Sequence, residues 1–252
     1  MADEYVKSSL QDGIRSIEFF HPQSNSLPRQ ILEGLAIAIE SAGNDPETKV
    51  IILQSQGEKA FCAGASFDEL VAISDEAGGL NFFSGFAYVI NAMRQAPKPI
   101  IARIQSKCVG GGVGLSAAAD YAIAIDNASI KLSELAVGIG PFVVGPVVER
   151  KIGVAAYTQL AFDAQSWRSA AWAREKGLFA EVHESMAGVD AAVDRLAKQL
   201  ARSNPEAMKE IKRVSWAGTD HWETLLLERA AISGRLVLSA FTKNAIEQFK
   251  QK

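Results

Sequence analysis

Three short apolar runs constrain the fold of this chain more than any other feature of its sequence. They read KVIILQ (49–54), PIIARI (99–104) and YAIAI (121–125), and helical patterns, notably 83–95, separate them. Nearly continuous apolar runs of this length are typical of strands buried on both faces of a parallel sheet. Strand, helix and strand in repetition therefore predict an α/β fold with mainly parallel strands.

Other elements are expected on either side of these runs. The turn Asp12-Gly13 followed by 16–20 predicts an amino-terminal β-hairpin. Pro28 opens a helical pattern in LPRQILEGLAIAIESA. From Val154 onward the pattern changes to successive helices, expected at 156–162, 169–177, 187–202, 206–214 and 222–240.

Composition narrows the class of protein. The chain has 252 residues, 48% hydrophobic and 22% charged, as in soluble globular proteins with a sizeable core. A net charge of -3 argues against nucleic acid as a partner. The longest uncharged apolar run, 135–148, is shorter than the roughly 20 residues of a membrane helix and contains two prolines. With no secretory signal, two cysteines and no metal-ligand spacing, we expect a cytoplasmic protein without a metal, membrane or nucleic-acid partner.

A glycine-rich stretch, CVGGGVGLSAAAD (108–120), follows the second apolar run after three residues. Its segment from Gly112 to Ala117 matches the dinucleotide motif G-x-G-x-x-A, and Glu134 follows at about the distance of the ribose-binding acid. The context does not fit, because the helix after the glycines can extend only to about Ala119. We therefore disfavour a dinucleotide site, and a phosphate-binding P-loop is excluded because its motif is absent.

The alternative is an anion site made of backbone. Glycines in the first turn of a helix let a ligand approach N–H groups that have no partner within the helix. Such donors suit a charge that develops during reaction, for example a thioester carbonyl becoming an enolate. A second bare segment, KAFCAGASFDEL (59–70), follows another predicted buried strand. Two such segments favour one shared site over two unrelated tight turns.

Six segments resemble the crotonase family, the enoyl-CoA hydratase/isomerase superfamily, and the resemblance covers essentially the whole chain. They are HPQSNSLP, KAFCAGASFDEL, KPIIARIQSKCVGGGVGLSAAADYAIA, KLSELAVGIGPF, GPVVERKIG and NPEAMKEIKRV. The resemblance implies an α/β fold with a crotonase-like ββα spiral core and a helical carboxy-terminal trimerisation region. On this basis we expect residues 1–190 to form the core with the active site. Residues 191–252 are expected to form a helical region for packing and assembly as a homotrimer or dimer of trimers.

The resemblance also implies which residues form the site. The backbone N–H groups of Ala65 and Gly111 would form an oxyanion hole for the thioester of an acyl-CoA substrate, and no separate cofactor is expected beyond the coenzyme A of that substrate. Substrate contacts are expected at Ala63, Gly64, Phe67, Gly110, Phe142 and Phe241. Phe241 is the candidate for a carboxy-terminal aromatic that a neighbouring subunit would supply.

Departures from the family bear on the reaction. Hydratases carry two glutamates, of which the first position is Gly114 here and the second is kept as Glu134. One carboxylate is enough to move a double bond, provided that burial raises its pKa toward the working pH. GIGPF (138–142) also resembles a segment of the family's Δ3,Δ2-enoyl-CoA isomerases, which rely on one glutamate. We therefore expect an isomerase with Glu134 as its catalytic residue.

Two alternatives stay open. The first is a hydratase that adds water to 2-enoyl-CoA. The second is a CoA-thioester binding protein with weak or no catalysis. The segment Ala72–Phe86, rich in glycine and phenylalanine, is expected to be a loop that covers the acyl tail.

Overall fold

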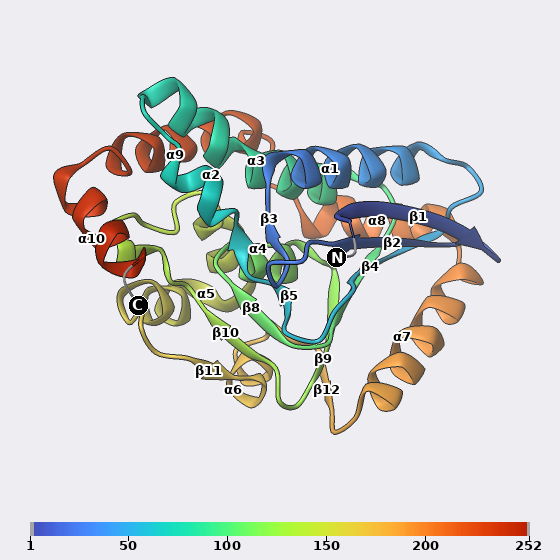
Figure 1. Ribbon diagram of the computed structural model, residues 1–252. Helices are drawn as coiled ribbons and strands as arrows, with labels where there is room; N and C mark the ends of the chain where they lie inside the picture. Colours follow the sequence, from blue (N-terminus) through green and yellow to red (C-terminus); the bar gives the residue numbers. More distant parts are fainter. Residues whose placement is uncertain (1–2, 251–252) are drawn as a thin grey trace.

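The computed structural model describes residues 3–250, and its largest sheet has six strands in the order β1-β2-β4-β7-β9-β12 (Figure 1). β1 is antiparallel to β2, and every other neighbouring pair is parallel. The strands are β1 (Tyr5–Gln11), β2 (Ile14–Phe20), β4 (Val50–Ser55), β7 (Ile100–Ile104), β9 (Tyr121–Ile125) and β12 (Glu181–His183). The expected hairpin and the three expected central strands are confirmed.

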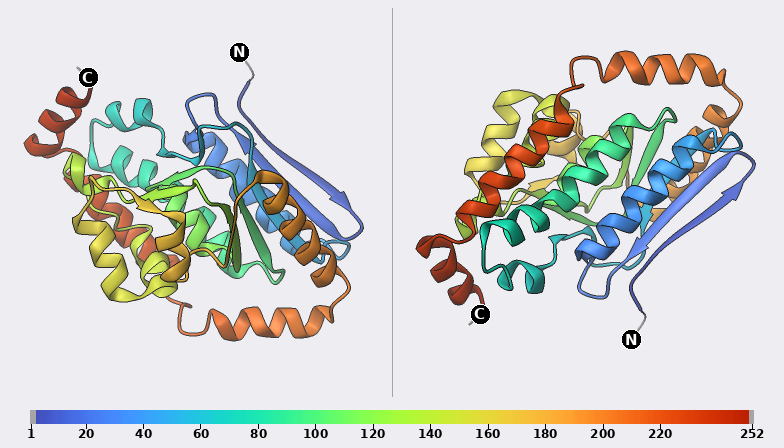
Figure 2. Two further views of the ribbon diagram at one scale, coloured as in Figure 1. Left: turned by 90° about the horizontal axis from the view of Figure 1, so that it is seen from below. Right: turned by 90° about the horizontal axis from the view of Figure 1, so that it is seen from above.

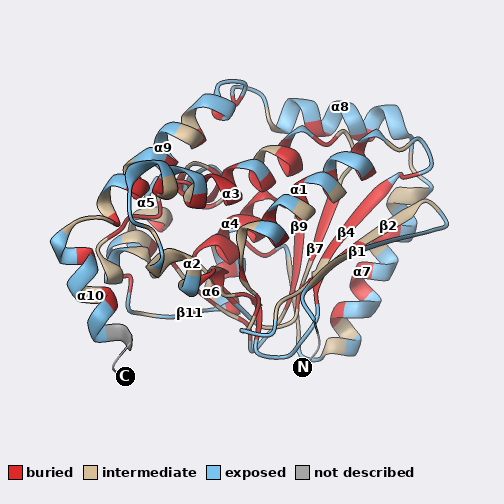
Figure 3. Ribbon diagram, turned by 45° about the horizontal axis from the view of Figure 1, so that its top comes forward, coloured by how far each residue is buried: buried red, intermediate tan, exposed pale blue. Residues whose placement is uncertain are grey.

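The central strands are mostly apolar because both faces of the sheet are covered. In β4, Ile51 and Leu53 belong to the main core, which also contains apolar residues of α1 (Arg29–Asn44), α3 (Glu76–Gln95) and α4 (Gly111–Ala118). Val50 and Ile52 point to the opposite face, where α7 (Met186–Ala201) packs on the sheet. Figure 3 shows β4, β7 and β9 as buried strands between these helices.

Two smaller sheets position the glycine-rich segments. One has the order β11-β10-β8-β5 and the other pairs β3 with β6. Their strands are β3 (Ser26–Leu27), β5 (Ala60–Cys62), β6 (Gly64–Ala65), β8 (Lys107–Val109), β10 (Ser129–Lys131) and β11 (Arg168–Ser169). Because β5 and β8 are adjacent and parallel, the segments that follow them emerge at the same edge.

The segment Ala72–Phe86 is not the loop that we expected from its composition. A short helix, α2 (Phe67–Val71), precedes it, and α3 begins at Glu76. Asp75 caps α3, because its carboxylate accepts a hydrogen bond from the Gly78 N–H at 2.7 Å. The adjacent glycines suggested a loop, but Gly79 is where α3 crosses α9 (Trp222–Leu236).

This helix crossing leads to a stability prediction. A β-carbon at Gly79 would lie 2.6 Å from the Gly234 Cα, so we expect Gly79→Ala to lower the free energy of unfolding by about 1–3 kcal/mol. Gly78→Ala is the matched control, since the nearest atom to its added carbon is a carboxylate oxygen at 3.2 Å. It should be neutral or stabilising by up to about 1 kcal/mol. Denaturant unfolding checks both variants, and equal effects would contradict the proposed cause.

The carboxy-terminal part is helical, as expected (Figure 2). Its remaining helices are α5 (Gly145–Phe162), α6 (Ala170–Glu175), α8 (Pro205–Ser215) and α10 (Ala240–Lys250). The expectation of one helix over 222–240 is wrong, because α9 ends at Leu236 and the Ser239 side chain accepts the Thr242 N–H at the start of α10. The expected boundary after residue 190 falls within α7, and that division stays a prediction. No helix within residues 3–250 has the length and apolar character needed to cross a membrane.

Candidate active site

The two glycine-rich segments meet where β6 approaches the first turn of α4. Gly64 has a φ of +95°, and a β-carbon there would lie 3.3 Å from the Val109 carbonyl oxygen and 3.8 Å from the Gly111 nitrogen. Bare backbone at this position lets the two segments lie side by side. The structure therefore brings together the two segments in which we expected hydrogen-bond donors, at Ala65 and Gly111.

Gly111 is the first residue of α4, and a first-turn N–H has no acceptor within its own helix. The residue before it, Gly110, has a φ of +51°, which favours glycine. A side chain at Gly111 would overlap the ring of Phe86 from α3. The backbone here is bare because of this packing, and the position can present an N–H to an anion but has no room for a side chain.

The Glu134 carboxylate lies beside the same turn. Glu134 begins the short 3₁₀-helix η1 (Glu134–Val137), which follows β10. β10 pairs with β8, and the Gly110 N–H donates to the Lys131 carbonyl oxygen at 2.9 Å. A β-carbon at Gly110 would lie 3.0 Å from Glu134 Oε1. The strand pairing thus delivers the carboxylate to the start of α4.

Burial changes the acidity of this carboxylate. Glu134 Oε2 is buried and has no hydrogen-bond partner in the described part of the chain. Desolvation is the main cause that raises the pKa of Glu134 to about 7, and a hydrogen bond from its own backbone opposes the rise. A carboxyl group with a pKa near neutrality can both accept and return a proton.

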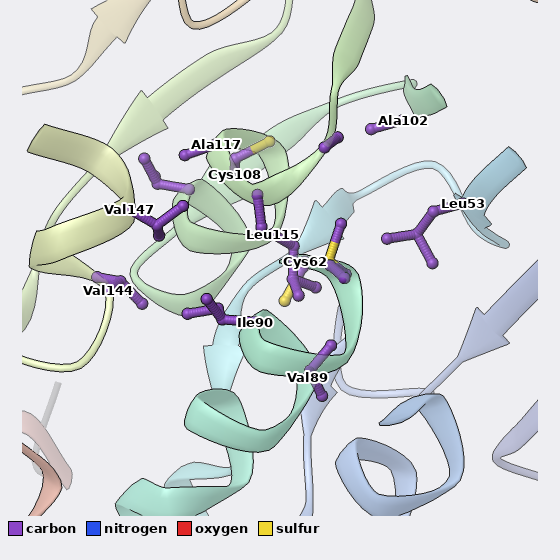
Figure 4. Close-up of a cluster of buried hydrophobic side chains, with 14 of the residues drawn as sticks. Leu53, Cys62, Val89, Ile90, Ala102, Cys108, Leu115, Ala117, Val144 and Val147 are labelled. Atoms are coloured by element: carbon purple, nitrogen blue, oxygen red, sulfur yellow. The ribbon is translucent and has the colours of Figure 1, made fainter. Parts of the chain in front are cut away.

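Gly114, which we interpreted as the place of a missing acid, has no vacant space beside it. It is buried in α4, and a β-carbon there would lie 2.5 Å from Val144 Cγ1. Figure 4 shows Val144 from the start of α5 and Ile90 from α3 flanking α4. The site therefore has Glu134 at one side of the turn and an apolar contact at the position where the resemblance led us to look for a second carboxylate.

The model of the enoyl-CoA hydratase/isomerase family matches residues 9–248. The chain belongs to this family. The mitochondrial methylglutaconyl-CoA hydratase of Rattus norvegicus is 33% identical over 193 residues, which cover 75% of this chain and 60% of the rat protein. The trans-2-decenoyl-[acyl-carrier-protein] isomerase of Streptococcus mutans is 26% identical over 230 residues, covering 87% of this chain and 86% of that protein. The family thus includes similar proteins named for hydration and for isomerisation.

Solved structures agree on the fold. The enoyl-CoA hydratase of Bacillus halodurans superposes with a TM-score of 0.89, covers 97% of this chain and 99% of its own, and is 21% identical. An enoyl-CoA hydratase/isomerase (crotonase) from Legionella pneumophila, described as putative, has a TM-score of 0.80 and 28% identity over 87% of this chain and 85% of its own. The expected crotonase-like architecture is confirmed.

The remaining predicted substrate contacts lie around this family site at different depths. Ala63 donates its N–H to the Asn25 carbonyl oxygen at 3.0 Å, just before Gly64. Phe67 packs in an apolar cluster with Ile139, which follows η1. A side chain at Gly140 would overlap the ring of Phe142. Their contact with substrate stays a prediction.

Phe241 reaches the site from α10 of the same chain. A β-carbon at Gly138, which ends η1, would lie 2.5 Å from its ring, and the Thr242 hydroxyl donates to the Gly138 carbonyl oxygen at 3.2 Å. The Phe241 side chain is nevertheless 67% exposed. Within this chain the Phe241 ring therefore packs against Gly138, at the end of the turn that begins with Glu134, while most of the side chain stays exposed.

Sequence reasoning missed three side chains of this family site: Phe86, Val144 and Tyr157. Phe86 fell in the expected loop, and Val144 fell in an apolar run without a local signal. Tyr157 was hidden inside a helical pattern, although its hydroxyl lies against Gly145. Only the path of the chain through space identifies these contacts.

Proposed function

We propose that the protein isomerises 3-enoyl-CoA to 2-enoyl-CoA, with Glu134 moving one proton. The observation that carries the proposal is the combination at α4: a buried carboxylate with a pKa of about 7 beside Gly110, and Val144 against Gly114. Hydration divides its work between two carboxylates, whereas a double-bond shift needs one group that takes and returns the same proton.

The proposed reaction has two proton steps. Ionised Glu134 takes a proton from C2, and the electrons of that bond form a dienolate whose oxygen carries the negative charge. The N–H groups of Ala65 and Gly111 would stabilise that oxygen, and removal of one such donor typically costs about 2.7–4 kcal/mol of transition-state stabilisation. Glu134 then returns the proton to C4, which leaves the double bond between C2 and C3.

The packing around Glu134 supports a mechanism in which this one carboxylate both takes and returns the proton. Phe86 lies against Gly111, and the α4 residues have no ionisable side chain, since the helix reads GGVGLSAA. Apolar walls keep water away from the dienolate and keep the carboxyl pKa high. We propose that the acyl chain lies along this apolar side, with coenzyme A passing Ala63, Gly64 and Phe67.

A two-substrate assay tests the proposal. The protein is incubated separately with a 3-enoyl-CoA and with the corresponding 2-enoyl-CoA, and the absorbance of the conjugated thioester is followed. We expect the absorbance to rise with the 3-enoyl substrate and to stay constant with the 2-enoyl substrate. A fall with the 2-enoyl substrate, confirmed as the 3-hydroxyacyl product by mass, would replace the isomerase by a hydratase. Binding of both esters without turnover would indicate a CoA-thioester binding protein instead of an enzyme.

A further inference from the structure

A tyrosine hydroxyl lies at the start of α5, beside the residues that close on α4. Gly153, with φ +79° and ψ +158°, kinks α5, and Tyr157 lies after the kink. A β-carbon at Gly145, the first residue of α5, would lie 2.6 Å from the Tyr157 hydroxyl oxygen. Gly145 directly follows Val144, which packs against Gly114. The hydroxyl therefore lies next to the part of α5 that takes the space of a second family carboxylate.

Tyr157 and Glu134 lie on two elements, α5 and η1, that pack against each other. Both α4 and η1 pack against α5, so the two side chains belong to elements in mutual contact. Burial is the largest cause that raises the pKa of Tyr157, and the negative charge of Glu134 is the next. The phenol therefore keeps its proton at neutral pH and can donate a hydrogen bond.

Each of the two groups lacks what the other offers. Glu134 Oε2 is a buried acceptor without a partner, and the Tyr157 hydroxyl has no hydrogen bond within residues 3–250. A buried acceptor left unpaired is destabilising, and more so when it is charged. A phenol that is partly buried usually finds a partner as well. One bridging water, which accepts a hydrogen bond from the phenol and donates one to the carboxylate, would satisfy both groups.

Few other ionisable groups face this pair. Glu149 of α5 also raises the pKa of Tyr157, and Arg229 of α9 lowers it. On α10, which packs against η1, Lys243 and Glu247 are exposed. The two cations of α5 are engaged away from η1: Arg150 donates to the Ser215 and Ala217 carbonyl oxygens, and Lys151 to those of Ala119 and Asp120. Tyr157 is thus the neutral donor of this neighbourhood.

We propose that the Tyr157 hydroxyl positions Glu134 by donating a hydrogen bond to one bridging water, which in turn donates to Oε2 of the ionised carboxylate. Oε1, which lies beside Gly110, then takes the C2 proton next to the N–H of Gly111. The inference rests on the proposed role of Glu134 as the base. Tyr157 is a positioning residue in this scheme, because it acts on the substrate only through Glu134.

The test compares Tyr157→Phe with Tyr121→Phe, which deletes the same hydroxyl from β9. The Tyr121 hydroxyl donates to Glu181 Oε1 at 2.9 Å on the main sheet and serves as the matched control. We expect Tyr157→Phe to lower kcat about tenfold with KM within twofold of the parent value. Loss of the donor should also move the Glu134 titration up by about one unit from its value of about 7. Tyr121→Phe should change neither quantity.

The Glu134 titration is followed independently of turnover by carbon-detected NMR of labelled glutamate carboxyl groups, with Glu134 assigned by its loss in Glu134→Gln. An unchanged Glu134 pKa in folded Tyr157→Phe would overturn the inference, whatever the activity. An unchanged pH–rate profile and kcat would overturn it as well. Different results would contradict the proposed isomerase activity. The parent protein would fail to convert 3-enoyl-CoA, or the Glu134→Gln variant would keep the parent rate. The NMR titration still decides the hydrogen bond in that case.

Discussion

Glu134→Gln is expected to lower kcat for the 3-enoyl substrate by a factor of about 10²–10⁴, the range that a positioned general base contributes. Glutamine nearly preserves the shape of the side chain beside Gly110 but cannot accept and return the proton. The measurement is steady-state turnover of a 3-enoyl-CoA at saturating substrate. Glu175→Gln removes an exposed carboxylate that pairs with Lys176 and is the matched control. A Glu134→Gln protein as active as this control would remove Glu134 from the mechanism.

The same carboxylate sets the direction of the pH dependence. Proton abstraction needs the ionised form, so kcat should rise with pH through about 7 and level off above it.

The free energy of unfolding should change with pH in the opposite direction. The unfolded chain ionises Glu134 near 4.5 and the folded chain near 7, so the unfolded state releases its proton first as pH rises between these values. The folded state therefore loses on the order of 3 kcal/mol over this window, and Glu134→Gln should abolish that loss.

Gly114→Glu is expected to inactivate the protein instead of converting it into a hydratase. The added β-carbon would lie 2.5 Å from Val144 Cγ1, and the carboxylate would follow it into the buried, apolar surroundings of Val144 and Ile90. Overpacking and an unpaired buried charge together should lower the free energy of unfolding by about 3 kcal/mol or more. The strain falls on the first turn of α4, since the Gly114 N–H donates to the Gly110 carbonyl oxygen.

Val144→Ala provides the control for this variant. Alone it removes two buried carbons and should cost about 2 kcal/mol. Combined with Gly114→Glu, it relieves the collision, so the double variant should be more stable than the sum of the single effects indicates. Chemical denaturation of all three variants measures the coupling. Additive losses would mean that Val144 does not limit position 114, and hydration of 2-enoyl-CoA by Gly114→Glu alone would contradict the packing argument.

The arrangement of strands was predictable because its cause is local. A nearly continuous apolar run such as KVIILQ is typical of a strand covered on both faces, and Val50 and Ile51 do contact opposite layers. The start of α3 was not predictable in this way. Gly78 and Gly79 lower helix propensity, and the contact with Gly234 that explains Gly79 comes from residues far along the chain. Tertiary packing overrides local preference at this position.

The site was predictable to the extent that backbone and motif define it. The meeting of Gly64 with Gly111, and the approach of Glu134 to Gly110, follow from the pairing of β5, β8 and β10. The role of Gly114 could be predicted only in part. The sequence shows that an acid is absent at this position, but it does not show that the Val144 side chain fills the space, because that contact depends on how α4 and the start of α5 pack.

The contact between α10 and η1 links the position of the last described helix to the affinity for a ligand at Glu134. Thr242 and Phe241 hold Gly138, and Gly138 closes the turn that begins with Glu134. Docking of α10 and ordering of this turn are therefore coupled equilibria. A ligand that binds better to the ordered turn favours the docked helix, and the docked helix raises the affinity for that ligand by the same factor.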